Sequence, residues 1–188
     1  MSIFDSLKKT AKEAKEAVDS VINKEAKKET IVFKALPESV EEMKALPEAS
    51  LDTPFKAAAL TVCALCAYAA APEIGIDMLN FLKGPQPLTN YDLSFLKDRF
   101  ADQKYVPFSY FEGAVPANDY TPSEPFTVTI ESNSHSYENE GYAKLFLCSG
   151  GADSPRQITL RKKGDQWFLW EQFLTVGIRK AKSEDPWA

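Results

Sequence analysis

Pro54-Phe-Lys-Ala-Ala-Ala-Leu-Thr-Val-Cys-Ala-Leu-Cys-Ala-Tyr-Ala-Ala-Ala-Pro72 is the most apolar stretch of the chain and predicts a buried helix. Alanine and leucine dominate it, and both have high helix propensity because they lose little entropy in a helix. Asp52 and Thr53 offer capping oxygens, Pro54 suits the first helical position, and Pro72 disfavours helix at the residue before it. The apolar run over residues 57–71 is shorter than the roughly 20 residues that cross a bilayer, so we expect a core helix and no membrane span.

The segments around this helix predict an α+β fold, with helices first and strands second. Further helices are expected at residues 39–46, 73–82 and 89–101, and strands at 30–36, 104–111, 126–130, 142–148, 157–161 and 166–173. Ser39 and Thr89 begin capping-box patterns, and Lys163-Gly-Asp165 is a hairpin signal. Consecutive strands joined by short turns indicate an antiparallel meander. We therefore predict an N-terminal helical layer, built around the buried Ala-rich helix and packed on a C-terminal antiparallel sheet.

The N-terminal residues differ from the rest, and we expect an appended amphipathic helix over residues 1–29 and a single α+β domain over 30–188. Apolar residues recur at spacings of three and four between charged ones, which is a heptad-like pattern. The pattern consists of Phe4, Leu7, Ala11, Ala14, Val18 and Val21. Four interpretations stay open: docking on its own domain, self-association, attachment to a membrane surface, or a solvated helix of marginal stability. We favour a protein partner or self-association, with Phe4, Leu7, Val18 and Val21 as interaction residues.

Composition and charge exclude several functions. The net charge of −5 is opposite to the basic surface that nucleic-acid binding needs, so no nucleic-acid partner is expected. The N-terminus has no basic start followed by an apolar block, so no secretory signal is expected. The three cysteines are an odd number and lie in apolar runs, which favours reduced thiols in a cytoplasmic protein.

Neither the cysteine pair nor the single histidine is expected to be catalytic. Cys63-Ala-Leu-Cys66 has the spacing of a redox pair, but such a pair is activated at a helix N-terminus, whereas this one lies inside an apolar helix. We expect both thiols to pack in the core, and Cys148 to be another small core residue at a strand end. His135 is the only histidine, so no two-histidine metal site can form. No metal and no cofactor are expected.

The loop Ser149-Gly-Gly-Ala-Asp-Ser-Pro-Arg156 is the most distinctive candidate for a ligand site. Its glycines allow unusual backbone angles, and successive N–H groups could hold an anion beside Arg156. The simpler interpretation, which we favour, is a strand connection in which Asp153 accepts turn hydrogen bonds and Arg156 pairs with an acid. The candidate ligand-binding residues are Ser149, Gly150, Gly151, Ser154, Arg156, Tyr142 and His135.

The last long strand contains two tryptophans, Trp167 and Trp170, which alternation places on opposite faces. One is expected in the core. The other is expected either to face a partner or to be covered by the N-terminal helix.

The C-terminal part of the chain contains four distinctive runs, which are Leu147-Cys-Ser-Gly-Gly-Ala-Asp-Ser-Pro-Arg156, Ile158-Thr-Leu-Arg-Lys-Lys-Gly-Asp-Gln-Trp-Phe-Leu-Trp-Glu171, Gly177-Ile-Arg179 and Asp185-Pro-Trp-Ala188. These runs resemble an uncharacterised bacterial domain family. The resemblance covers residues 31–188, is strongest over 147–188 and leaves out the N-terminal helix. It implies a bacterial cytosolic domain and supplies no catalytic residues.

Together these features predict a non-enzymatic interaction module of a bacterial cytosol, with the N-terminal helix and the aromatic sheet edge as contact surfaces. The alternative is a domain that binds a small ligand or anion, or a weakly marked enzyme, with its pocket near Ser149–Arg156. A deep pocket with converging polar groups at that loop would favour the alternative. A flat or filled surface there would count against it.

Overall fold

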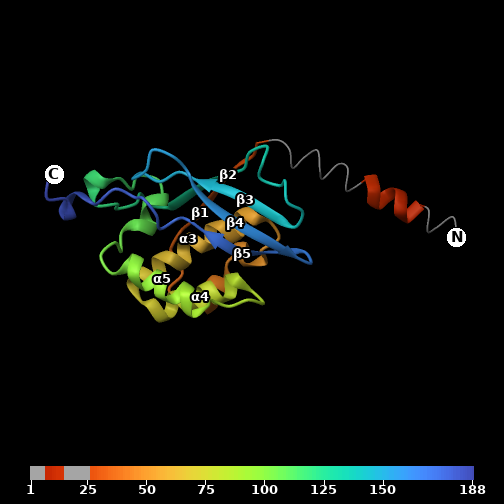
Figure 1. Cartoon of the computed structure of the whole chain (residues 1–188), viewed down its shortest axis with the longest axis horizontal. Helices are drawn as coiled ribbons and strands as arrows, with labels where there is room; N and C mark the ends of the chain where they lie inside the picture. Colours follow the sequence, from red (N-terminus) through yellow and green to blue (C-terminus); the bar gives the residue numbers. More distant parts are fainter. Residues whose placement is uncertain (1–6, 15–25) are drawn as a thin grey trace.

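The computed structural model describes residues 7–14 and 26–188, and its main body has a helical layer packed on one sheet (Figure 1). The five strands lie in sequence order and every neighbouring pair is antiparallel, so the sheet is a meander. The strands are β1 (Lys28–Phe33), β2 (Phe126–Glu131), β3 (Tyr142–Leu147), β4 (Arg156–Lys163) and β5 (Gln166–Gln172). The predicted α+β class and antiparallel meander are confirmed.

The Ala-rich stretch forms helix α3 (Pro54–Ala70), the longest helix of the described residues. Thr53 caps it by accepting a hydrogen bond from the Lys56 backbone N–H at 3.3 Å, and Pro54 occupies its first turn. Nearly all its side chains are buried, and it contacts all five strands. Thr61, its buried polar residue, donates to the Ala57 carbonyl at 2.8 Å. Within residues 7–14 and 26–188, no helix is both long and apolar enough to cross a membrane.

Three shorter helices surround α3, and their ends follow the capping signals of the sequence. They are α2 (Val40–Ala45), α4 (Pro72–Lys83) and α5 (Asn90–Phe100). The Ser39 hydroxyl accepts from the Glu42 N–H, while Thr89 and Asp92 form a reciprocal capping box. Gly84, with φ +61°, ends α4. The short distance between α3 and α4 depends on small residues at their interface, because Tyr68 lies directly over Gly75.

The sheet has one face buried under the helices and one face directed away from them. Alternating residues of each strand, such as Val128, Leu145 and Leu160, are buried in the core. Residues of the other face include Thr30 and Thr129, whose hydroxyls lie 3.2 Å apart. β3 occupies the centre of the sheet, between β2 and β4.

A bulge separates the two halves of β5. Leu160 pairs with Leu169 and Thr159 pairs with Glu171, so Trp170 has no partner residue in β4. An inserted residue of this kind bends the strand and redirects its side chain. Trp170 is exposed, whereas Trp167 packs against the core, as expected for one buried and one outward tryptophan.

Two local predictions are wrong. Residues 104–111 do not form a strand: Val106–Tyr110 is a 3₁₀ helix, and only Phe111 bridges to Val128 of the sheet. The fixed φ of Pro107 and its missing N–H suit the first turn of a helix, while aromatic content alone had suggested a strand. Cys148 is exposed and not part of the core, because it follows the buried Leu147 by one residue and alternation directs it outward.

We expect Gly75→Ala to destabilise the protein although alanine favours helix. A Cβ atom at this position would lie 2.3 Å from the Cα and Cβ atoms of Tyr68, so α3 and α4 must separate. Overpacking of this kind costs about 1–3 kcal/mol of unfolding free energy. Urea unfolding followed by circular dichroism measures it.

The matched control is Asp77→Ala, which places alanine on the exposed surface of the same helix and should change stability by less than about 0.5 kcal/mol. Equal stability of the Gly75→Ala protein and the wild type would contradict the close contact between α3 and α4.

Candidate functional site

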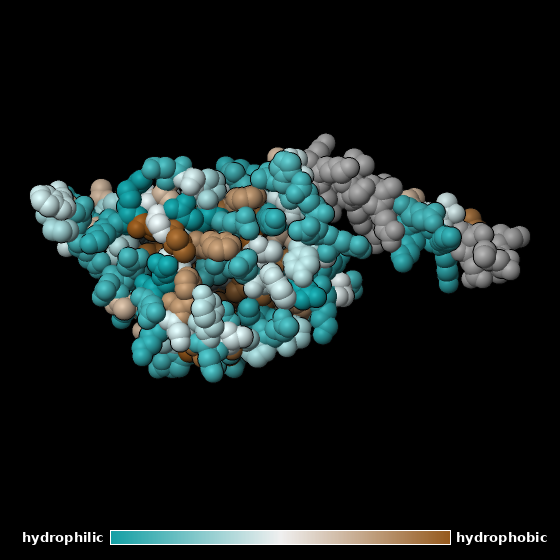
Figure 2. Space-filling model, in the orientation of Figure 1, coloured by the Kyte–Doolittle hydropathy of each residue, from teal (hydrophilic) through white to brown (hydrophobic). Residues whose placement is uncertain are grey.

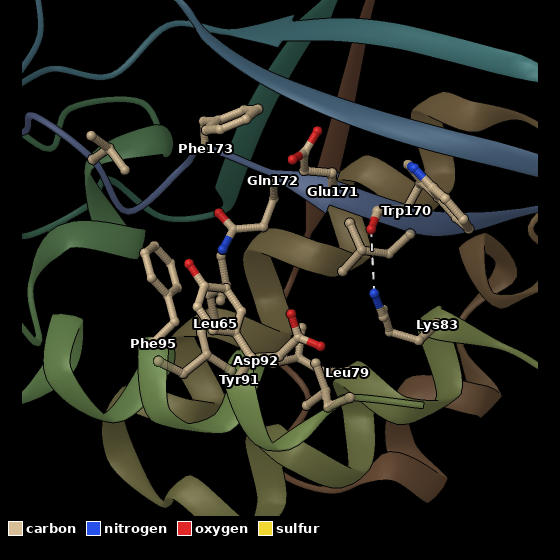
Figure 3. Close-up of a pocket in the computed structure, with 14 residues that line it drawn as sticks. Leu65, Leu79, Lys83, Tyr91, Asp92, Phe95, Trp170, Glu171, Gln172 and Phe173 are labelled. Atoms are coloured by element: carbon tan, nitrogen blue, oxygen red, sulfur yellow. Dashed lines mark hydrogen bonds between the residues drawn. The ribbon is translucent and has the colours of Figure 1, made fainter. Parts of the chain in front are cut away.

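An apolar groove lies at the border between the edge strand β5 and the helices α4 and α5 (Figure 3). Its volume is about 520 Å³, within the range of roughly 300–1,000 Å³ that is typical of ligand-binding clefts. The groove exists because α3 fills the space under the sheet, whereas α4 contacts β5 and residues of α5 line the opposite wall without closing the border. We call it the β5 groove.

Leucines form the floor of the β5 groove and aromatic residues form its rim. The floor residues are Leu65, Leu79, Leu96 and Leu169, all buried. On the rim, Tyr91 is 78% exposed, Phe173 is 42% exposed and Trp170 is 38% exposed. Apolar side chains also gather on this face of the molecule within a largely hydrophilic surface (Figure 2). Exposed aromatic residues that surround an apolar floor are typical of surfaces that bind other molecules.

Three of the polar side chains along the β5 groove are already bonded within the chain. The Asp92 carboxylate accepts hydrogen bonds from the backbone N–H and hydroxyl of Thr89, and the Gln172 amide oxygen accepts from the Leu174 N–H at 2.7 Å. Lys83 donates to the Trp170 carbonyl at 3.3 Å, as the dashed line in Figure 3 marks. The Glu171 carboxylate has no bonded partner among the described residues. The polar groups therefore stabilise the walls of the groove.

The lining of the β5 groove lacks one common arrangement for covalent catalysis, a hydroxyl or thiol activated by histidine. The fourteen residues that line the β5 groove include no Ser, Thr, Cys or His, so a nucleophile paired with a histidine base is absent from this part of the described structure. Burial of apolar surface is the interaction that such a lining offers, and it contributes about 25 cal/mol for each Å² removed from water.

Some backbone groups at the outer edge of β5 are already hydrogen-bonded, so this edge does not offer a full row of free N–H and C=O groups to a new strand. The Trp167 N–H donates to the Leu51 carbonyl at 2.8 Å, and the Trp170 carbonyl accepts from Lys83. An edge whose backbone groups are occupied resists the addition of a further strand. A ligand of the β5 groove would therefore be held by side-chain contacts.

The glycine loop predicted from the sequence is packed against other segments. A Cβ atom at Gly150 would lie 1.9 Å from the Ala114 carbonyl oxygen, and one at Gly151 would lie 2.0 Å from the Tyr120 hydroxyl. The buried Ser149 hydroxyl donates to Ser109 at 2.7 Å and accepts from the Gly151 N–H at 3.0 Å. The glycines thus permit close packing within the fold.

Arg156 holds neighbouring loops together through its guanidinium group. It donates to the carbonyl oxygens of Val176, Gly177 and Ser154 at 2.7, 2.6 and 2.8 Å, and also to the Ser154 hydroxyl. The simpler interpretation had expected Arg156 to pair with an acid, and this is wrong: its carbonyl partners belong to the backbone. The acid Asp153 instead pairs with Arg179 at 2.8 Å, and this guanidinium lowers the pKa of the Asp153 carboxyl group.

The seven candidate ligand-binding residues do not converge. Tyr142 lies at the opposite end of β3 from Ser149, in edge-to-face contact with Trp170. His135 lies in the loop before β3, where its Nδ1 atom is 2.5 Å from the Glu138 carboxylate and its side chain is largely exposed. A ligand site at the Ser149–Arg156 loop therefore stays a prediction, with its polar groups already bonded within the chain.

The N-terminal contact residues fall mostly outside the described residues. Phe4, Val18 and Val21 lie there, and Leu7 lies in a helix over residues 7–14 with 61% of its surface exposed. All other side chains of this short helix are exposed too. The described part of the apolar pattern is thus accessible to solvent.

The sequence interpretation missed the α5 contribution to the β5 groove. Tyr91 and Phe95 lie four residues apart and so form a second apolar ridge on α5, beside the one with Leu96. This i, i+4 aromatic pair was the available signal. The position of the ridge opposite β5 depends on how α5 packs, which no local pattern contains.

The cysteine pair is inert. Cys63 and Cys66 are buried in α3, and burial raises the pKa of both thiols well above the ordinary value. Among the residues that the structure describes, no group of three or more His, Cys, Asp or Glu side chains is arranged to hold a metal ion.

These features define an α+β domain in which N-terminal helices pack on a C-terminal meander and leave an apolar groove at the sheet edge. The family model of the domain of unknown function DUF6935 matches residues 35–182, and the chain belongs to this family. The match confirms the resemblance to an uncharacterised domain family. Comparisons with curated proteins and with solved structures find no match.

We expect one of the three cysteines to react with dithiobis(nitrobenzoic acid) in the native protein near neutral pH. Cys148 is exposed, whereas Cys63 and Cys66 are buried and their raised pKa keeps them as thiols, which are poor nucleophiles. Absorbance of the released nitrothiobenzoate counts the reactive groups, and unfolding in denaturant should release the other two. Fast reaction of all three in the native state would contradict burial of the pair.

We expect Arg156→Lys to destabilise the protein by about 1–3 kcal/mol, because an ammonium group cannot replace the fork of donors that joins three carbonyls. Urea unfolding measures the change. Lys97→Arg, on the exposed surface of α5, is the control and should stay within about 0.5 kcal/mol of the wild type. Unchanged stability in Arg156→Lys would contradict a role of these three bonds in holding the loops together.

Proposed function

We propose that this chain is a non-enzymatic interaction module of a bacterial cytosol, and that the β5 groove is its main contact surface. The observation that supports this most is the exposure of Tyr91, Trp170 and Phe173 around an apolar floor. Exposed aromatic side chains keep apolar surface in contact with water. Removal of that surface from water by a bound partner is favourable in free energy. Aromatic residues of this type supply much of the binding energy in protein interfaces.

The N-terminal helix is the second proposed contact surface. Residues 7–14 expose Leu7 beside several lysines, so the described part of the helix offers one apolar side to a partner. Self-association through this helix is the form of the proposal that the experiment below tests.

The alternative of a small-ligand site at the Ser149–Arg156 loop has less support. The β5 groove and a second cavity of about 570 Å³, between residues 34–38 and the C-terminal end of α3, are both lined by other segments. At the loop itself, Ala114 and Tyr120 occupy the space in front of the glycines. No observation favours an enzyme at this position.

The test compares masses in solution by light scattering after size exclusion. We expect the full chain to be a dimer or larger, and both a shortened chain that begins at Ala26 and the Tyr91→Ser/Phe173→Ser variant to be monomers. The shortened chain keeps β1 and the bonds between Lys27 and Ser132. Val115→Ser, an exposed apolar residue outside the groove, is the control and should keep the mass of the wild type.

A monomeric full chain would exclude self-association. Binding of the neutral dye Nile red then tests the groove alone: its emission should rise with the full chain and fall in the Tyr91→Ser/Phe173→Ser variant. Equal emission in the two proteins would contradict a binding role for the β5 groove.

A further inference from the structure

A second hollow lies beside the β5 groove and has the opposite character. It is enclosed by the β4–β5 hairpin and the loop that follows α4, and its volume is about 320 Å³. Four cations line it, Lys83, Arg161, Lys162 and Lys163, and no carboxylate does. In a chain with a net charge of −5, this concentration of positive charge is local and not a property of the whole surface. We call it the cationic hollow.

The four cations have no acidic partners. None of them forms an ion pair within the described part of the chain. The Arg161 guanidinium lies 4.6 Å from the ring centre of Trp170 and 5.5 Å from that of Tyr142, and Lys162 lies 5.7 Å from the ring centre of Trp167. Contacts with aromatic faces orient a cation without neutralising it. The charges of the hollow are therefore available to an anion.

The walls of the hollow are held in place by backbone geometry. Gly164, with φ +59°, makes the tight turn of the hairpin, and the ladder of β4 and β5 continues to Lys163 and Gln166. On the other side, Gly84 approaches Phe168 so closely that a Cβ atom would lie 2.5 Å from the ring. Lys83 is bonded to the Trp170 carbonyl. The cations are thus presented by ordered elements, which lowers the entropy cost of binding.

We propose that the cationic hollow binds a phosphorylated small molecule through its phosphate groups. Phosphate is the anion that fits best, because its several oxygens accept from the arginine fork and from separate ammonium groups at the same time. The aromatic side chains of Phe168 and Trp170 offer an apolar surface to the body that carries the phosphate. The proposal does not rest on the interaction function of the β5 groove, although the two share Lys83, Leu169 and Trp170 as a wall.

The test is isothermal titration calorimetry of the full chain with sodium pyrophosphate and with ADP, without divalent cations. The variant Lys162→Gln/Lys163→Gln removes two charges from the hollow, and the control Lys104→Gln/Lys180→Gln removes two exposed charges elsewhere. We expect at least about a tenfold loss of affinity in the hollow variant, the size of one charge-assisted hydrogen bond. The control should lose less than about threefold, because charges beyond a Debye length are screened at physiological salt.

Tryptophan emission locates the ligand independently. Pyrophosphate does not absorb in the tryptophan range, so a change of emission on its addition should be present in the wild type and absent in Trp170→Phe. Absence of heat and of emission change with both probes at about millimolar concentration would overturn the proposal. Equal losses in the hollow variant and in the control would overturn it too, since they would show only an effect of net charge.

Discussion

The burial of α3 is the constraint on which the rest of the structure depends. A helix that is apolar on nearly every side must be covered all round, because each exposed apolar Å² costs free energy. The sheet covers one side, and α4 together with the 3₁₀ helix Val106–Tyr110 covers others. Alanines along α3 allow these elements to approach closely, and Gly75 of α4 lies directly against Tyr68. The positions of the sheet, of α4 and of the 3₁₀ helix Val106–Tyr110 are therefore set relative to this one helix.

The β5 groove lies where the helical layer stops covering the sheet. The helical layer covers the inner face of the sheet, but it stops at the edge strand, where α4 contacts β5 and residues of α5 line the opposite wall of the β5 groove. Trp170 follows the buried Leu169 and is directed outward, beside this border. It is also the inserted residue of a β-bulge, and bulges are common at sheet edges and next to functional sites. Fold and proposed contact surface thus have one physical origin.

Two arginines in the second half of the chain show how the same side chain serves different purposes. All the described bonds of Arg156 go to oxygens of the surrounding loops, so it acts as a structural clamp. Arg161 lies against two aromatic rings and has no oxygen partner within the described residues. The N–H donors of Arg161 are therefore available to a ligand, whereas those of Arg156 are occupied by bonds within the chain. The sequence analysis chose Arg156 as a candidate ligand-binding residue because it is next to the glycine loop.

The sequence by itself determined the features that arise from neighbouring residues. Helix α3, the caps at Ser39 and Thr89, the turn at Gly164 and the order of strands depend on propensity and on bonds between residues only a few positions apart. Tertiary structure decided the 3₁₀ helix at 106–110, the exposure of Cys148 and the convergence of Tyr91 with Trp170 and Phe173. These features depend on which distant segments cover each other, and burial of α3, not any local pattern, selects that arrangement.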